Sequence, residues 1–129
     1  DWKMGQAIVP KVVVVEDDPD LRSLAAALLE ESDMEVVELE TADEAISYMR
    51  RYGHDVAALF VDLNLPGSMD GMDLARTVHM RWPETVIIAT SGNPQDRLEL
   101  LPRGTRYFQK PWRALDVMIA VERAAALRC

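Results

Sequence analysis

The stretch VVVVEDDPD, from Val12 to Asp20, indicates the fold class and raises an electrostatic question. Four β-branched apolar residues are typical of a buried strand, and they run directly into the carboxylates of Glu16, Asp17 and Asp18. At ~4–5 Å and an effective dielectric constant of ~20, each pair of like charges costs roughly 3–4 kcal/mol. We therefore expect another group to offset the repulsion within this cluster.

Short apolar runs alternate with helical stripes along the whole chain. The runs predict five strands, at Val12–Val15, Met34–Leu39, Val56–Val61, Thr85–Thr90 and Arg106–Gln109. Apolar residues at helical spacing predict helices between and after them, in the stripes Leu21/Leu24/Ala25/Leu28/Leu29, Ala42/Ala45/Ile46/Met49, Leu74/Ala75/Val78/Trp82 and Ala114/Val117/Met118/Val121/Ala125. Together with a short fourth helix, described next, these stripes give five helices. Five strands alternating with five helices predict an α/β domain with a parallel sheet.

Three local signals refine these helices. Asp18 followed by Pro19 is typical of an N-cap and a proline in the first turn. Thr41 with Glu44 forms a capping-box pattern, and Asp70 is expected to be a turn or cap residue before the third helix. The fourth helix is expected to be short, because the segment NPQDRLELLPRG offers only about two turns before proline and glycine stop it.

The bulk composition fits one small domain. We divide the 129 residues into an N-terminal extension or expression remnant (1–10) and one domain (11–129). The net charge of −8 disfavours binding to nucleic acid or to anionic membranes. The single cysteine, Cys129, rules out an internal disulfide, and no apolar run reaches the ~20 residues of a membrane span. With no signal-peptide pattern at the start, we expect a reducing compartment, the cytoplasm.

Polar residues collect where four of the predicted strands end. Glu16 and Asp17 follow the first, Asp62 the third, Ser91 the fourth and Lys110 the fifth. Singly, most of these have ordinary roles as turn or loop residues. Ligands of open α/β sheets, however, bind outside the carboxyl ends of the strands. Three acids, a hydroxyl and a lysine at that edge predict a site for a divalent hard cation with an anion held over it.

The segments VVVVEDDPDLR, FVDLNLPGSMDG, IIATSG and YFQKPW together resemble a response-regulator receiver domain of the chemotaxis type, from Val12 to about Leu127. The resemblance implies a flavodoxin-like, doubly wound sheet with strand order 2-1-3-4-5 and helices on both faces. That order is carried over from the family and is not a consequence of the apolar pattern itself. The resemblance also implies a phosphoprotein of two-component signalling that switches its surface for a downstream protein, without direct contact with nucleic acid or membrane.

The resemblance further assigns roles to the residues. Asp62 would accept a phosphoryl group from a phosphohistidine on a sensor histidine kinase or a histidine phosphotransfer domain. Mg²⁺ would be bound by Asp17, Asp62, the backbone carbonyl of Asn64 and, through water, Glu16. Lys110 and Ser91 would contact the phosphoryl group, and Ser91 and Tyr107 would form the switch. The chain would then be a signalling phosphoacceptor that assists its own phosphorylation and dephosphorylation, and not an enzyme with a separate substrate.

Other classes fit the residues less well. A flavodoxin-like electron carrier needs a phosphate-cradling loop where this chain has EDDPD, and a haloacid-dehalogenase-type phosphatase needs a proton-transferring acid where it has Asn64. No P-loop motif is present in the sequence. The remaining alternative is a receiver-like interaction module that is not phosphorylated. Differences from the common receiver pattern are the longer PGSMDG loop, Ser91 in place of threonine, Thr105 in place of alanine, and the short fourth helix.

Overall fold

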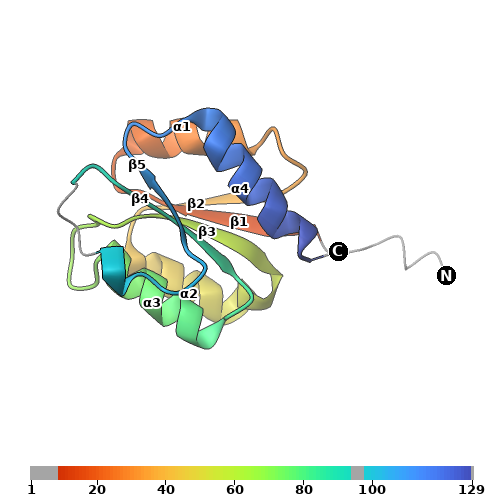
Figure 1. The fold of residues 1–129 in the computed structure, drawn as a ribbon. Coiled ribbons are helices and arrows are strands. Elements are labelled where there is room, and N and C mark those ends of the chain that lie inside the picture. The colour runs from red at the N-terminus through yellow and green to blue at the C-terminus, as the bar shows by residue number, and fades with distance from the viewer. Residues whose placement is uncertain (1–8, 94–97, 129) are drawn as a thin grey trace.

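The computed structural model describes residues 9–93 and 98–128, which form one five-stranded parallel sheet flanked by helices (Figure 1). The strands are β1 (Lys11–Val15), β2 (Glu35–Leu39), β3 (Val56–Asp62), β4 (Val86–Ser91) and β5 (Arg106–Gln109). Their spatial order is β2-β1-β3-β4-β5, and every neighbouring pair is parallel. The expected doubly wound sheet and its strand order are therefore confirmed.

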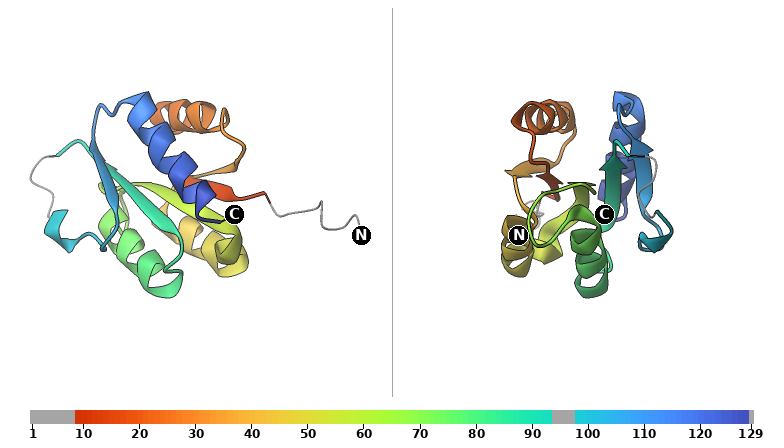
Figure 2. Two further views of the ribbon diagram at one scale, coloured as in Figure 1. Left: turned by 45° about the vertical axis from the view of Figure 1, so that its right-hand side comes forward. Right: turned by 90° about the vertical axis from the view of Figure 1, so that its left-hand side faces the viewer.

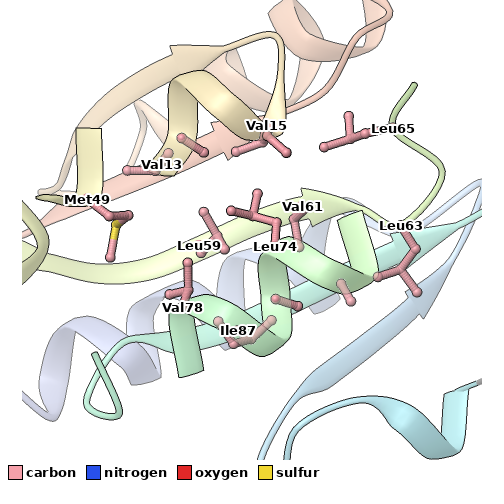
Figure 3. Close-up of a cluster of buried hydrophobic side chains, with 14 of the residues drawn as sticks. Val13, Val15, Met49, Leu59, Val61, Leu63, Leu65, Leu74, Val78 and Ile87 are labelled. Atoms are coloured by element: carbon pink, nitrogen blue, oxygen red, sulfur yellow. The ribbon is translucent and has the colours of Figure 1, made fainter. Parts of the chain in front are cut away.

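Alternate residues of the central strands face two separate apolar cores. Val13 and Val15 of β1 lie with α2 (Ala42–Tyr52) and α3 (Gly71–Arg81) on one face of the sheet, and Figure 3 shows this cluster. Val12 and Val14 lie with α1 (Pro19–Leu29) and α4 (Ala114–Ala126) on the other face. Figure 2 shows the two helical layers on either side of the sheet. A strand buried on both faces reads as a continuous apolar run, which explains VVVV.

The helix caps follow the sequence signals. Asp18 caps α1, where its carboxylate accepts hydrogen bonds from the backbone N–H of Asp20 and Leu21. Thr41 and Glu44 form a capping box at the start of α2. Asp70 forms a second capping box at the start of α3, with Asp73 as the partner. All three predicted caps are confirmed.

The connection between β4 and β5 differs from the sequence expectation of a short fourth helix. In its described part it contains a single 3₁₀ turn, Leu98–Leu100, and residues 94–97 of the expected helix lie outside the described residues. The described chain therefore has four α-helices. Leu98 and Leu101 pack on the core of the α2–α3 face, and the Arg76 side chain of α3 donates to the Leu100 carbonyl at 2.8 Å. Pro102 prevents a longer helix at this point. The few contacts above hold the segment in place.

The apolar stripe of α1 is also narrower than expected. Ala25 and Leu29 are buried, whereas Leu24 is 59% exposed. Helical spacing alone does not tell which edge of a stripe is covered, since that depends on the neighbouring elements. No described helix has the length and apolar composition that crossing a membrane requires.

Gly71 sets how closely α3 approaches the end of β3. A Cβ atom at this position would lie 1.9 Å from the backbone oxygen of Asp62 and 2.6 Å from Cα of Leu63. Gly71→Ala is therefore expected to push α3 away from β3 and to lower the free energy of unfolding by about 3 kcal/mol, at the upper end for overpacked sites. Urea unfolding of the variant measures the loss.

Gly92→Ala is the matched control for this prediction. Its added Cβ would meet only Lys110 Cδ, at 4.0 Å, so the variant should unfold like the wild-type protein. Equal stability of Gly71→Ala and wild type would show that α3 can shift at no cost and that the close approach is not required.

Candidate functional site

The residues that follow β1, β3 and β5 are each bonded to the end of a neighbouring strand. Glu16 N–H donates to the Leu39 carbonyl at 3.1 Å, Leu63 N–H to the Thr90 carbonyl at 2.8 Å, and Lys110 N–H to the Ser91 carbonyl at 2.8 Å. Each bond extends the ladder of parallel strands by one residue into the loop. The sheet itself therefore places these loops side by side.

Three carboxylates meet at this edge. Glu16, Asp17 and Asp62 each offer one oxygen atom, and these atoms lie within 4.8 Å of one another. Glu16 and Asp62 are only 6% and 5% exposed, and Asp17 is half-buried. The Glu16 carboxylate accepts from the Asp18 N–H at 3.1 Å and the Asp62 carboxylate from the Asn64 N–H at 2.9 Å. The acids that the sequence placed at successive strand ends therefore form one cluster.

Lys110 provides the positive charge at the cluster. Its ammonium group donates to Asp62 Oδ2 at 2.9 Å and to Glu16 Oε1 at 3.1 Å, while its side chain is 22% exposed. It thereby joins β5 to the ends of β1 and β3. In the described structure this lysine offsets the repulsion between Glu16 and Asp62, the two most buried acids of the cluster.

The ionisation of both partners reflects this arrangement. Burial raises the pKa of Glu16, and the nearby Asp62 charge raises it further, against the lowering effects of the Asp18 N–H and Lys110. Burial alone would lower the pKa of Lys110, but its hydrogen bonds to Asp62 and Glu16 raise it above its ordinary value. Lys110 is therefore charged at neutral pH, and burial makes the charge of Glu16 costly to maintain.

Ser91 is the last residue of β4, and Tyr107 lies within the neighbouring strand β5. The fully buried Ser91 hydroxyl accepts from the Asn93 N–H and donates to the Asn93 carbonyl, both at 3.0 Å. Tyr107 is half-buried, and its ring packs against the core of the α2–α3 face. Asn64 is exposed, two residues after Asp62. Glu16, Asp17, Asp62, Asn64, Ser91 and Lys110 thus belong to strand ends or loops of one sheet edge, whereas Tyr107 lies within β5, paired with Ala89 of β4.

One residue at this edge was missed from the sequence. The Arg22 guanidinium, on α1, donates to the Glu16 backbone carbonyl at 2.8 Å and lies 3.8 Å from Glu38 at the end of β2. It fixes the loop that carries the acidic pair. Its position one turn into a helix carries no recognisable signal, since exposed arginines are common there.

Residues 12–122 match the family model for the response regulator receiver domain. The chain belongs to this family. The match covers β2 to β5 in full, all but the first residue of β1, and most of the last helix of the receiver domain.

Curated relatives agree with this assignment. The chain is 34% identical over 110 residues to the transcriptional regulatory protein AruR of Pseudomonas aeruginosa, covering 81% of this chain and 45% of that protein. It is 36% identical over 105 residues to the two-component response regulator PhoP of the same species, covering 79% of this chain and 45% of that protein. This receiver domain thus spans about half the length of these relatives.

Solved receiver domains share its fold. A response regulator receiver domain protein from Clostridium thermocellum superposes with a TM-score of 0.83 at 22% identity, over 93% of this chain and 97% of that one. The receiver domain of NtrX from Brucella abortus superposes with a TM-score of 0.77 at 26% identity, over 89% of this chain and 98% of that one. The flavodoxin-like receiver fold of this chain is thereby established.

The acidic cluster fits a divalent hard cation. Mg²⁺ takes oxygen ligands at about 2.1 Å, so two of its ligands lie at most about 4.2 Å apart. The carboxylate oxygens of Glu16, Asp17 and Asp62 already lie within 4.8 Å of one another, so a small inward movement would be enough. The residues present could therefore hold such an ion.

Proposed function

We propose that this receiver domain is the phosphoacceptor of a two-component system and that Asp62 takes a phosphoryl group from a phosphohistidine. The observation that carries the proposal is the buried Asp62 carboxylate, held 2.9 Å from the Lys110 ammonium within a cluster of acids suited to Mg²⁺. A carboxylate with an adjacent cation and metal site is a recognised arrangement for forming an aspartyl phosphate.

In the proposed step one Asp62 oxygen attacks phosphorus, and the O–P bond forms while the N–P bond to the donor imidazole breaks. The imidazole nitrogen keeps the electron pair of the broken bond. Mg²⁺, held by Asp17, Asp62 and the Asn64 carbonyl with Glu16 acting through water, would neutralise charge on the phosphoryl oxygens. Lys110 would move its hydrogen bonds from the acids to a phosphoryl oxygen, and the Ser91 hydroxyl would leave Asn93 to donate to another.

The partners follow from this chemistry. The donor would be a sensor histidine kinase or a histidine phosphotransfer domain, and the receiver would assist the transfer without acting on a separate substrate. Withdrawal of the Ser91 hydroxyl would let the Tyr107 ring rotate inward and alter the surface around β5 for a downstream protein. Only groups that contact the phosphoryl differently in two states can transmit the signal.

Phosphoryl transfer from a small donor tests the function directly. The protein incubated with Mg²⁺ and acetyl phosphate should gain one phosphoryl group by intact mass spectrometry, and excess chelator should prevent this. No adduct under conditions that label another receiver domain would favour the alternative, an interaction module that is not phosphorylated.

Metal binding gives a separate prediction. Millimolar Mg²⁺ should raise the melting temperature of the protein, because a ligand that binds only the folded state stabilises it by mass action. Asp17→Asn removes an anionic ligand and should abolish most of that rise. Asp33→Asn, at an exposed acid outside the cluster, is the control and should respond like wild type. If all three proteins respond equally to Mg²⁺, the cluster is not the metal site.

A further inference from the structure

The sheet edge where the strands begin, opposite the acidic cluster, is hollowed by three cavities. Helices run back along the sheet, so the end of α4, the loop between α3 and β4 and the turn before β5 meet there (Figure 1). The cavities have volumes of about 620, 260 and 470 Å³. The first shares Thr85 and Arg128 with the second, and Val86, Gly104 and Leu127 with the third. They form one continuous surface, which we call the basic edge.

The charge of the basic edge is opposite to that of the chain. The chain has 22 Asp and Glu residues against 14 Lys and Arg. Among the described residues that line the three cavities, the only acid is Glu84, whereas there are five arginines and two histidines. The arginines are Arg81, Arg103, Arg106, Arg123 and Arg128. Such a local excess is repulsive in the free protein and favours an anionic partner.

None of these arginines forms an ion pair within the described part of the chain, where all four ion pairs use Lys11, Arg22 or Lys110. Arg128 is committed to the fold, since it donates to the His54 carbonyl at 2.7 Å and the Val56 carbonyl at 2.5 Å. The Arg81 guanidinium lies 5.4 Å from the centre of the Trp82 ring. Arg103, Arg106 and Arg123 are exposed and have no acidic partner among the described residues.

Apolar side chains lie between these cations. The third cavity is lined by Val86, Ala120, Ala124 and Leu127, together with Arg106 and Arg123. Leu127 is 77% exposed and also lines the largest cavity. A partner that covers this surface must therefore offer an apolar group flanked by anions, which is the usual composition of a protein interface anchored by arginine.

We propose that the basic edge binds an acidic polypeptide segment that carries an apolar anchor. Its carboxylates would pair with Arg103, Arg106 and Arg123, since the planar guanidinium fork matches a carboxylate, and its apolar residue would cover Leu127. The surface lies at the opposite end of the strands from Asp62, so binding does not require phosphorylation.

Nucleic acid and a second copy of the chain fit less well. The phosphate backbone would meet the repulsion of a chain with net charge −8. Trp82, the one Phe, Tyr or Trp ring among the described residues that line the cavities, already has the Arg81 guanidinium over it. The acidic cluster of a second copy is mostly buried and paired with Lys110. A short acidic peptide carries few charges and avoids both difficulties.

Fluorescence anisotropy with a labelled peptide of alternating Glu and Leu residues tests the proposal on the whole chain. Arg103→Gln combined with Arg123→Gln should weaken binding about tenfold, because two carboxylate pairs are lost. The matched control, Arg50→Gln with Arg51→Gln, removes two exposed arginines of α2 and should bind like wild type. Raising the ionic strength from about 0.01 M to about 1 M shortens the Debye length from about 30 Å to about 3 Å and should also weaken binding.

Three outcomes would overturn the proposal. An equal loss of peptide affinity in both double variants would show that the peptide is attracted to exposed arginines in general and not to the basic edge. Tighter binding of oligothymidylate, weakened by the same Arg103 and Arg123 changes, would assign the surface to nucleic acid. Salt-sensitive self-association in sedimentation, abolished by those changes, would assign it to a second copy of the chain.

Discussion

Asp62→Asn is expected to accept no phosphoryl group from acetyl phosphate and Mg²⁺ under conditions in which the wild-type receiver gains one. The amide keeps the size of the side chain but lacks a nucleophilic carboxylate, so the O–P bond cannot form. Asp62 is 5% exposed and is bonded to Asn64 N–H and Lys110, so few other changes at the site are expected. Intact mass spectrometry measures the adduct directly.

An acid next to the other end of the same strand gives the matched control. Asp55 lies directly before β3, at the opposite end from Asp62, and Asp55→Asn should be labelled like wild type. An adduct that persists in Asp62→Asn would mean that another carboxylate, with Glu16 and Asp17 the nearest candidates, is the acceptor.

Lys110→Met is expected to destabilise the metal-free protein by roughly 3 kcal/mol, because removing one partner of a largely buried ion pair leaves the other charge uncompensated. Here one ammonium serves two carboxylates whose side chains are 8% and 6% exposed, Glu16 and Asp62. Mg²⁺ should restore more stability to the variant than it adds to wild type, since the ion would replace the missing positive charge. Urea unfolding with and without Mg²⁺ measures both effects.

The pH dependence of this loss has a definite sign. A carboxyl group with a raised pKa contributes stability below its unfolded pKa, and that contribution is lost as the pH rises through its folded pKa. The pKa of Glu16 is already raised above 4.5 by burial, and removal of Lys110 should raise it further. The deficit of Lys110→Met should therefore be largest near neutral pH and shrink on acidification, as Glu16 takes up a proton.

A lysine that pairs with an exposed carboxylate provides the comparison. Lys11 pairs with Glu35 at 3.4 Å, and the Glu35 side chain is 55% exposed, so Lys11→Met should cost at most about 1 kcal/mol. Similar losses in Lys11→Met and Lys110→Met, with the same response to Mg²⁺, would contradict the role of Lys110 as the counter-charge of the acidic cluster.

The strands and the position of the site could be predicted because both depend on local sequence. Runs such as VVVV and VAALFV are apolar at every position. This pattern is typical of a strand whose two faces are both covered by helices. Parallel strands then bring their carboxyl ends to one edge, so Asp62 and Lys110 were expected near each other although 48 residues separate them.

Features that depend on tertiary contacts could not be predicted in this way. The helical pattern of α1 includes Leu24, yet no neighbouring element covers it. The segment before β5 forms a 3₁₀ turn in its described part, and helical spacing does not encode its contacts with α3 and the core. The two hydrogen bonds of Lys110 and the contact of Arg22 with the Glu16 carbonyl depend on side-chain geometry, which spacing does not encode.

The backbone bonds between strand-end loops and neighbouring strands also limit where the chain can tolerate insertions. Leu63 N–H is tied to the Thr90 carbonyl and Asp70 caps α3, so both ends of the loop after Asp62 are anchored. Residues 66–69 of the longer PGSMDG segment lie between these anchors, where added length forms a surface excursion without moving Asp62 or the helix. An insertion between Asp62 and Leu63 would instead shift the acceptor relative to Lys110. Length variation among related proteins should accordingly concentrate between these two anchors.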